Sequence, residues 1–120
     1  MMTIEIFLAL ALLFVKHWYI DFVDQNDEEA KHKGIYGDWI GMGHSLKHGF
    51  GTILVFLIVD PFPVNVLLLG LIDTVVHYHV DWAKMKFGNR DISTRAFWAQ
   101  LGLDQLAHYL TYLGLVWMIT

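Results

Sequence analysis

The stretch Asp73–Asp81, with the sequence DTVVHYHVD, lies in an apolar run and spaces an acid, a histidine and a second acid four residues apart. Residues four apart lie on the same face of an α-helix, so Asp73, His77 and Asp81 form one polar stripe. A charged side chain at the centre of a bilayer costs about 2.5–3.5 kcal/mol on insertion scales and therefore suggests a functional site. The stretch predicts a helix with one polar face.

Three other apolar segments carry polar side chains at the same spacing. The pairs are His17 and Asp21, His44 and His48, and Asp104 and His108. Imidazoles and carboxylates are common metal ligands, and each pair projects from one helix face. Four matched groups on four segments predict a metal site within the membrane.

The composition is that of a membrane protein. Of the 120 residues 56% are hydrophobic and only 17% are charged, against about 25% charged in a typical soluble protein. The length predicts one domain, residues 1–120. A net charge of −4 without a basic run predicts no nucleic-acid partner. Because cysteine is absent, nitrogen and oxygen must supply any metal ligands.

Each apolar segment is about 20 residues long, the length that a helix needs to cross the hydrocarbon core. Helices are expected because lipid cannot hydrogen-bond to the backbone. The sequence predicts an all-α integral membrane four-helix bundle with antiparallel, up-down-up-down topology. Its helices are expected at about residues 2–22, 39–59, 62–83 and 96–119. The expected connections are a tight turn at Asp60–Pro63 and solvated loops at Asp24–Lys33 and Lys84–Arg95.

This topology predicts that all four polar groups meet on one side of the membrane. His17 and Asp21 are late in the first segment, while His44 and His48 are early in the second. Every Lys and Arg also falls toward that side. By the positive-inside tendency we expect the site side to be cytoplasmic and both termini to face outward.

Nine candidate ligands exceed the four to six that one ion takes, so two metal ions are expected. The residues expected to bind metal directly are His17, Asp21, His44, His48, Asp73, His77 and His108. Asp81 and Asp104 are expected to bind metal, to act as a general base or to orient a histidine. The mixture of imidazole and carboxylate suits Zn, Mn, Fe or Ni.

Other polar residues receive lesser roles. Gln25 and Gln105 are expected to support the ligands, and Asp38 and either Ser93 or Thr94 to cap helices. His79 faces away from His77, and His32 lies in a loop, so neither is expected at the site.

Hydrolysis of a phosphoester, in a lipid headgroup or a lipid-linked molecule, is the most concrete reaction that fits. A metal lowers the pKa of bound water toward neutrality, and Lys84 shares a helix face with Asp81 and is the preferred residue to stabilise charge. Asp81, Asp104 and Lys84 are the expected catalytic residues.

Three alternatives remain open. In the first, the chain is a membrane protein that metal stabilises and that binds a host or phage partner without catalysis. In the second, the polar side chains bind no metal and hold the helices together through a hydrogen-bond network. An ion or proton pathway is disfavoured because Ile53–Val59 and Leu113–Ile119 are apolar. Membrane lipids are expected partners, and a homo-oligomer is compatible with the sequence.

The combined motifs resemble a known family. They read His17-x-x-x-Asp21-Phe22-x-x-Gln25, His44-x-x-x-His48, Asp73-x-x-x-His77-x-x-x-Asp81 and Asp104-Gln105-x-x-His108. This pattern resembles a family of small phage and bacterial inner-membrane proteins of unknown function, and is similar to the group labelled membrane-bound metal-dependent hydrolases. The resemblance implies a multi-pass protein of the bacterial inner membrane with a His/Asp metal site.

Overall fold

The computed structural model describes residues 1–61 and 65–120, which form helices and connections without a β-strand. The elements are α1 (Thr3–Trp18), a π-helical segment η1 (Tyr19–Asp24), α2 (Asp27–His32), α3 (Trp39–Val59), α4 (Val66–Phe87) and α5 (Arg95–Met118). The prediction of an all-helical chain is therefore confirmed over the described residues. The predicted turn at Asp60–Pro63 and the predicted start of the third helix fall largely on residues 62–64, outside the described residues.

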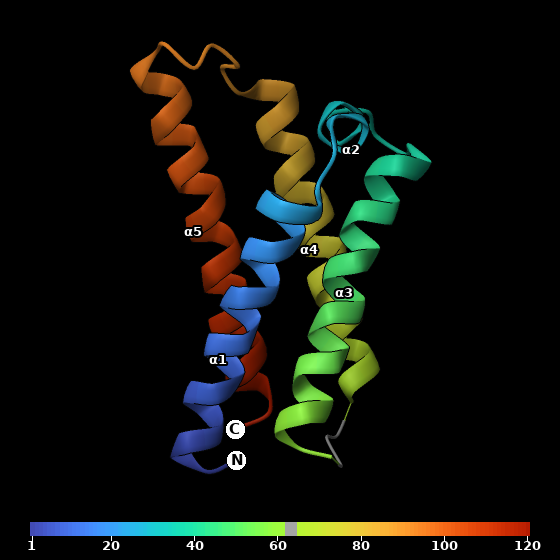
Figure 1. Ribbon diagram of the computed structural model, residues 1–120, viewed down its shortest axis with the longest axis vertical. Helices are drawn as coiled ribbons and strands as arrows, with labels where there is room; N and C mark the ends of the chain where they lie inside the picture. The colour runs from blue at the N-terminus through green and yellow to red at the C-terminus, as the bar shows by residue number, and fades with distance from the viewer. Residues whose placement is uncertain (62–64) are drawn as a thin grey trace.

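The four long helices lie side by side and alternate in direction (Figure 1). Helix α3 packs against α1 and α4, and α5 packs against α4 and α1. Both chain termini lie at one end of the molecule, which we call the terminal end. Helix α2 and the α4–α5 connection lie at the other end, which we call the α2 end.

Three helical segments are long and apolar enough to cross a membrane, where the sequence predicted four. They are Thr3–Asp24, Trp39–Val59 and Val66–Phe87. Helix α5 has 24 residues, but polar and charged side chains interrupt it between Arg95 and His108. By length and composition these three segments could cross a membrane, and α5 is not among them.

Helices α3 and α4 approach each other closely at two glycines. A Cβ atom on Gly49 would lie 2.7 Å from the carbonyl oxygen of Gly70, and a Cβ on Gly70 would lie 2.9 Å from that of Gly49. Side chains at either position would push the helices apart, since backbones approach this closely only at small residues. The glycines therefore help to bring His48 on α3 next to His77 on α4.

The segment predicted as a solvated loop, Asp24–Lys33, is mostly helical. The π-helical segment η1 extends α1 to Asp24, and the side chain of Asn26 caps α2 by accepting from the amide of Glu29 at 2.9 Å. Glu29 and Lys33 are only 7% and 6% exposed. The prediction was wrong here because these charged side chains find partners inside the molecule.

The predicted caps of the long helices agree better with the structure. The Asp38 carboxylate accepts from the amide of Ile40 at 2.9 Å at the start of α3. The Thr94 hydroxyl accepts from the amide of Phe97 at 3.3 Å at the start of α5.

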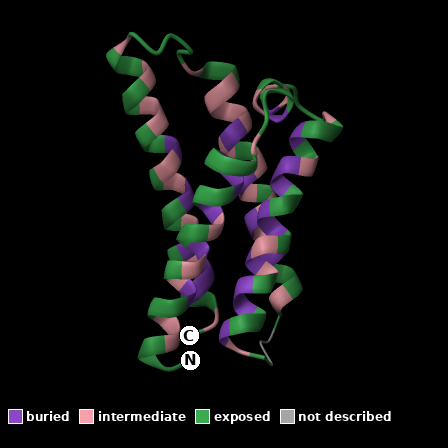
Figure 2. Ribbon diagram, in the orientation of Figure 1, coloured by how far each residue is buried: buried purple, intermediate pink, exposed green. Residues whose placement is uncertain are grey.

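Buried residues lie where the helices face one another (Figure 2), and their chemistry changes along the molecule. Toward the terminal end they form an apolar cluster that includes Leu13, Phe56, Leu69 and Leu115. Toward the α2 end the buried side chains are imidazoles and carboxylates.

Candidate metal centre

Ligand atoms from η1, α3, α4 and α5 converge in two overlapping groups. The first group is Asp21, His44, His48 and His77, and the second is His77, Asp81 and His108. Within each group the ligand atoms all lie within 4.8 Å of one another, and every residue is buried. We call these six residues the metal cluster. They come from segments far apart in sequence, as the predicted topology required.

The carboxylate of Asp21 is the centre of the first group. Its Oδ1 lies 2.9 Å from Nε2 of His44, 2.8 Å from Nε2 of His48 and 3.5 Å from Nε2 of His77. A carboxylate oxygen has two lone pairs, so three N–H donors would exceed its capacity. The same atoms would all fit around a cation.

The carboxylate of Asp81 has the same role in the second group. Its Oδ2 lies 3.1 Å from Nε2 of His77 and 3.6 Å from Nε2 of His44, and its Oδ1 lies 3.2 Å from Nε2 of His108. The rings of His48 and His77 stack with centroids 3.5 Å apart, and those of His77 and His108 at 4.0 Å. Three protonated rings packed in this way would repel one another.

Several buried atoms of the site lack a hydrogen bond among the described residues. They are both ring nitrogens of His77, Oδ2 of Asp81 and Oδ1 of Asp104. Some of them keep ion-pair contacts without hydrogen-bond geometry, as Oδ2 of Asp81 does with Lys33 at 3.2 Å and with His77 at 3.1 Å. Metal binding would satisfy several of these atoms at once.

The contact with Glu29 shows which ring nitrogen of His44 carries a proton. Nδ1 of His44 lies 3.0 Å from Oε2 of Glu29, and an ionised carboxylate only accepts hydrogen bonds. Nδ1 therefore carries a proton, and in the neutral ring the Nε2 lone pair faces Asp21. A lone pair facing a carboxylate is repulsive unless a cation lies between them, so His44 fits a metal ligand oriented by a carboxylate.

His17, an expected ligand, lies beside the two groups and has a different proton arrangement. Gln105 donates its amide to Asp104 at 3.0 Å, so its carbonyl oxygen faces Nε2 of His17 at 2.7 Å. Nε2 of His17 therefore donates to Gln105, and the Tyr112 hydroxyl donates to Nδ1 at 2.8 Å. His17 also lies 3.3 Å from Oδ2 of Asp21. In this geometry His17 contacts Asp21, and Gln105 contacts His17 and Asp104.

Asp73, another expected ligand, lies outside both groups. Lys16 donates to its Oδ2 at 2.8 Å and Thr52 donates to the same atom at 2.5 Å. Lys16 also contacts the Tyr112 hydroxyl at 3.2 Å and the carbonyl oxygen of His48 at 3.3 Å. Spacing correctly placed Asp73 on the inner face but did not reveal that a lysine on α1 would meet it there.

The three expected catalytic residues lie at the cluster or beside it. Asp81 belongs to the second group. Oδ1 of Asp104 lies 3.4 Å from Nε2 of His108, and Lys84 donates to Oδ2 of Asp104 at 3.1 Å. Asp104 thus links a ligand histidine to a lysine.

The comparison with protein families covers almost the whole chain. The family described as "Protein of unknown function (DUF3307)" matches residues 3–120. The chain belongs to this family. Searches of the curated proteins and of the solved structures gave no match. The expected membership of a family of unknown function is confirmed, and no similarity to the membrane-bound metal-dependent hydrolases was found.

The sequence interpretation of this DUF3307 chain missed Glu29 and Lys33. Glu29 orients His44, and Nζ of Lys33 lies 3.2 Å from Oδ2 of Asp81. Lys33 also donates at 2.8 Å to Gln25, which was expected to support a ligand. Burial acts to lower the pKa of Lys33, but the carboxylates of Asp81 and Asp21 outweigh it and raise that pKa, so Lys33 stays charged. A signal existed, because residues 17, 21, 25, 29 and 33 continue the four-residue spacing.

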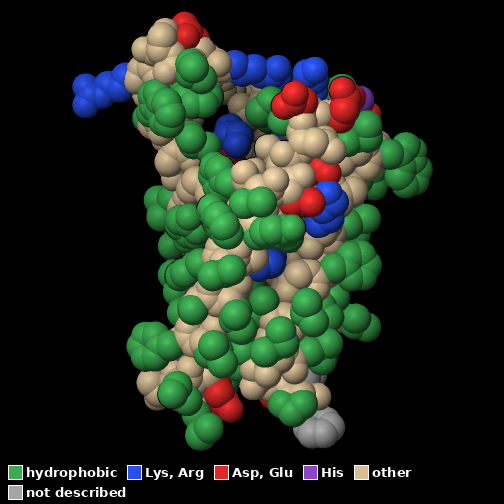
Figure 3. Space-filling view, viewed as in Figure 1, with side chains coloured by type: hydrophobic (Ala, Val, Ile, Leu, Met, Phe, Trp, Pro, Cys, Tyr) green, Lys and Arg blue, Asp and Glu red, His purple; other side chains and the backbone are tan. Residues whose placement is uncertain are grey.

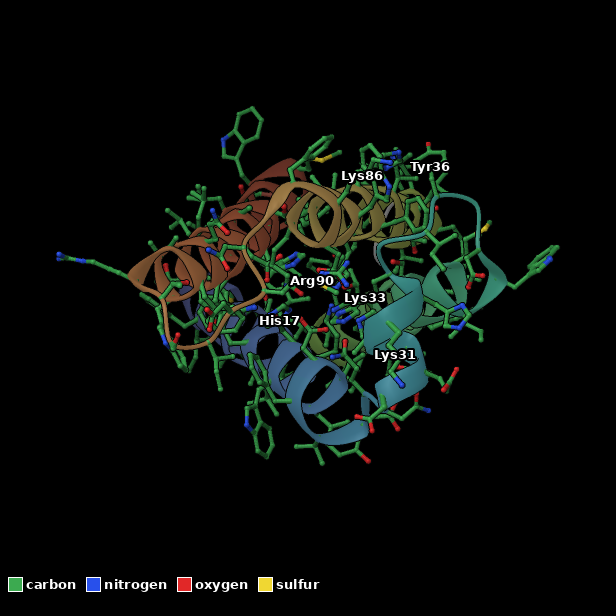
Figure 4. The ribbon with its side chains drawn as sticks, turned by 90° about the horizontal axis from the view of Figure 1, so that it is seen from above. His17, Lys31, Lys33, Tyr36, Lys86 and Arg90 are labelled. Carbon is green, nitrogen blue, oxygen red and sulfur yellow. The ribbon has the colours of Figure 1, made fainter. Side chains whose placement is uncertain are left out.

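A pocket of about 200 Å³ lies toward the α2 end, and two lysines that line it reach the site, Lys33 at Asp81 and Lys84 at Asp104. Three cationic side chains line it, namely Lys33, Lys84 and Arg90. Figure 3 shows a hollow near the top of the molecule with Lys or Arg atoms inside. Seen from above, Lys33 and Arg90 point toward the space between the helices, whereas Lys31 points outward (Figure 4). We call this the basic pocket.

The two histidines that were not expected at the site lie outside both groups. Nε2 of His79 lies 3.0 Å from the Tyr36 hydroxyl on the outer surface. Nδ1 of His32 lies 3.0 Å from Oδ1 of Asp38. This contact raises the pKa of His32 and lowers the pKa of Asp38.

Proposed function

We propose that this chain is a four-helix integral membrane protein that binds two divalent metal ions and hydrolyses a phosphate-containing substrate beside them. The observation that carries the proposal is that two lysines lining a cationic pocket also contact carboxylates at the metal cluster. Lys33 and Lys84 line the basic pocket, and they also contact Asp81 and Asp104. Metal-ligand chemistry and anion-binding chemistry therefore share one location.

The side chains of α5 support its assignment as the fourth membrane helix. Its polar residues Asp104 and His108 are buried, whereas Leu103, Leu106 and Leu110 are exposed. An apolar outer face with a polar inner face suits a helix that borders lipid and lines a site. The basic residues gather toward the α2 end, which we place at the cytoplasmic face of a bacterial inner membrane with both termini outside.

The distances in the cluster support metal ligation. Four ligands held at about 2.0–2.1 Å in a tetrahedron lie about 3.3 Å from one another. The separations between imidazole nitrogens and carboxylate oxygens in the cluster run from 2.8 to 3.6 Å. Six cluster residues, with Asp104 beside them, exceed the four ligands of one zinc ion, so we propose two ions, with Zn, Mn, Fe or Ni suited to these donors.

In hydrolysis, separate residues of the chain would accept a proton and stabilise negative charge. Metal held by the cluster would supply a water with a pKa near neutrality and would act as a Lewis acid toward the phosphate. Asp104 is placed to accept a proton, because its Oδ1 lacks a hydrogen bond among the described residues. Lys84, now held by Asp104 at 3.1 Å, is placed to stabilise negative charge on the phosphate.

A second function is favoured by the burial of the cluster. His48 and His77 are 0% exposed, and closed metal sites are usually structural, whereas catalytic sites keep one position open. On this alternative the metals hold the helices together, and the protein binds a host or phage partner without turnover.

Hydrolysis of phosphoesters by metal-loaded protein distinguishes the two functions. We expect turnover by the wild type and by His79→Ala, which changes an exposed histidine on the same helix. We expect no turnover by His77→Ala, with helical content retained by circular dichroism. Metal-loaded wild-type protein that hydrolyses neither soluble nor lipid phosphoesters would favour the structural alternative.

A further inference from the structure

We propose that the basic pocket binds a phosphate group, and that metal binding in the cluster switches this anion site on. The proposal rests on the metal centre proposed above and adds the ligand of the neighbouring pocket and its coupling to the metal. It does not depend on whether turnover follows.

The pocket has the size and the donors for a compact anion. Its volume of about 200 Å³ is below the about 300–1,000 Å³ of pockets that enclose drug-sized ligands. Beside its three cations, the lining includes the uncharged polar side chains of Gln25, Asn89 and Gln100. Gln25 follows η1, Asn89 lies in the α4–α5 connection and Gln100 lies in α5, so hydrogen-bond donors face the pocket from several sides.

The three cations differ in what already neutralises them. Lys33 is paired with Asp81 and Lys84 with Asp104. Arg90 donates to the carbonyl oxygen of Met85 at 2.8 Å, and no carboxylate pairs with it among the described residues. A guanidinium with free donors binds phosphate oxygens in a two-point geometry that a lysine lacks.

Metal binding would change this balance of charge. A metal ion on Asp81, and one beside Asp104, would withdraw the carboxylate charge that now holds the two lysines. Both ammonium groups would then lie near a cation and would be repelled toward the pocket they already line. An anion in the pocket would restore neutrality, so metal and phosphate should each raise the affinity for the other.

Phosphate binding to full-length protein tests the inference. Inorganic phosphate is titrated calorimetrically into detergent-solubilised protein, once metal-loaded and once after chelation. We expect at least about tenfold tighter binding to the metal-loaded form, which is the size of a modest coupling between sites. Equal affinity in the two forms, or no binding to protein that carries metal, overturns the inference and leaves the metal centre standing. Protein that takes up no metal contradicts the proposed function itself.

Two matched variants test the pocket in metal-loaded protein. This comparison needs no chelated protein, so it holds even if chelation unfolds the chain. Arg90→Gln should weaken phosphate binding by about tenfold or more without changing metal content, since one charge-assisted contact is worth about that much. Lys86→Gln is the control, because Lys86 lies over the Trp82 ring and does not line the pocket. Equal effects of the two variants would contradict the assignment.

The source of the phosphate is decided by a lipid arm of the experiment. Metal-loaded protein is placed in nanodiscs of phosphatidylcholine with or without phosphatidic acid. If phosphatidic acid competes with inorganic phosphate in an Arg90-dependent way, the pocket takes a lipid headgroup. If inorganic phosphate binds and phosphatidic acid does not compete, the ligand is a soluble phosphate. Binding of neither rejects the site.

Discussion

The terminal half and the α2 half of this molecule both contain fully buried side chains, but of opposite chemistry. Leu13 and Phe56 are 0% exposed in the terminal half, and His48 and His77 are 0% exposed in the α2 half. Apolar side chains need only packing, whereas buried imidazoles and carboxylates need partners for every proton and lone pair. Packing alone therefore satisfies the buried side chains of the terminal half, whereas those of the α2 half depend on what binds there.

Two substitutions should separate the halves most strongly. His77→Ala should lower metal affinity by more than about a hundredfold, because losing even a residue behind a ligand typically costs 10–100-fold. Phe56→Ala should destabilise the fold by about 3–5 kcal/mol and leave metal binding intact. Metal titration and thermal unfolding of both variants measure this. If Phe56→Ala lost the metal as readily as His77→Ala, the division into halves would be wrong.

The boundary between the halves is the buried pair of Lys16 and Asp73. Removing one charge strands the other, so Lys16→Met should cost about 3–5 kcal/mol. Lys16→Met combined with Asp73→Leu should recover most of that loss, because no unpaired charge remains. Denaturation in detergent provides the measurement. A double variant as unstable as the single one would assign Asp73 a role beyond this pair, including the ligand role expected from sequence.

A smaller effect is expected from the carboxylate behind His44. Glu29→Gln keeps the size of the side chain but weakens its hold on the Nδ1 proton, and should lower metal affinity by about 10–100-fold. Glu28→Gln on the same helix, where Glu28 is exposed, should change little. Competition with a chelator of known affinity measures the metal affinity of both variants. Equal affinities would show that Glu29 does not support metal binding.

The sequence predicted the cluster better than its surroundings, for physical reasons. Helical spacing alone puts His44, His48, His77 and His108 on inner faces, and alternating helices bring those faces together. Residue spacing does not tell which side chains on different helices will meet. It therefore grouped Asp73 with the ligands, although Asp73 forms an ion pair with Lys16. It also missed Glu29, since a charged segment between apolar helices is usually solvated.

The role of His17 depends on information that the sequence lacks. Its ring protons are set by Gln105 and Tyr112 on α5, and those contacts follow from how α1 and α5 pack. The π-helical segment η1 likewise sets the position of Asp21, and π-helical turns often occur at functional sites.

The smallest predicted effect concerns pH at the surface of the α2 end. The raised pKa of His32 makes its contact with Asp38 stabilising at low pH, and this contribution is lost as pH rises through that pKa. The pKa of Asp38 is lowered, so its carboxylate stabilises the fold at pH values above the ordinary pKa of an aspartate. This stabilisation is lost as the pH falls through the lowered pKa. The protection factors of amides at the start of α3, which remove the pH dependence of the intrinsic exchange rate, should therefore be higher near pH 6 than near pH 8. His32→Gln should abolish the difference and His79→Gln should keep it.

The most direct test of the central claim is the metal content of wild-type protein purified in detergent from metal-replete cells. Two equivalents of a divalent transition metal per chain, retained through size-exclusion chromatography, are the predicted result. A folded, helical protein that carries no metal and takes none up would contradict the account, and the α2 half would then be a network of hydrogen bonds only.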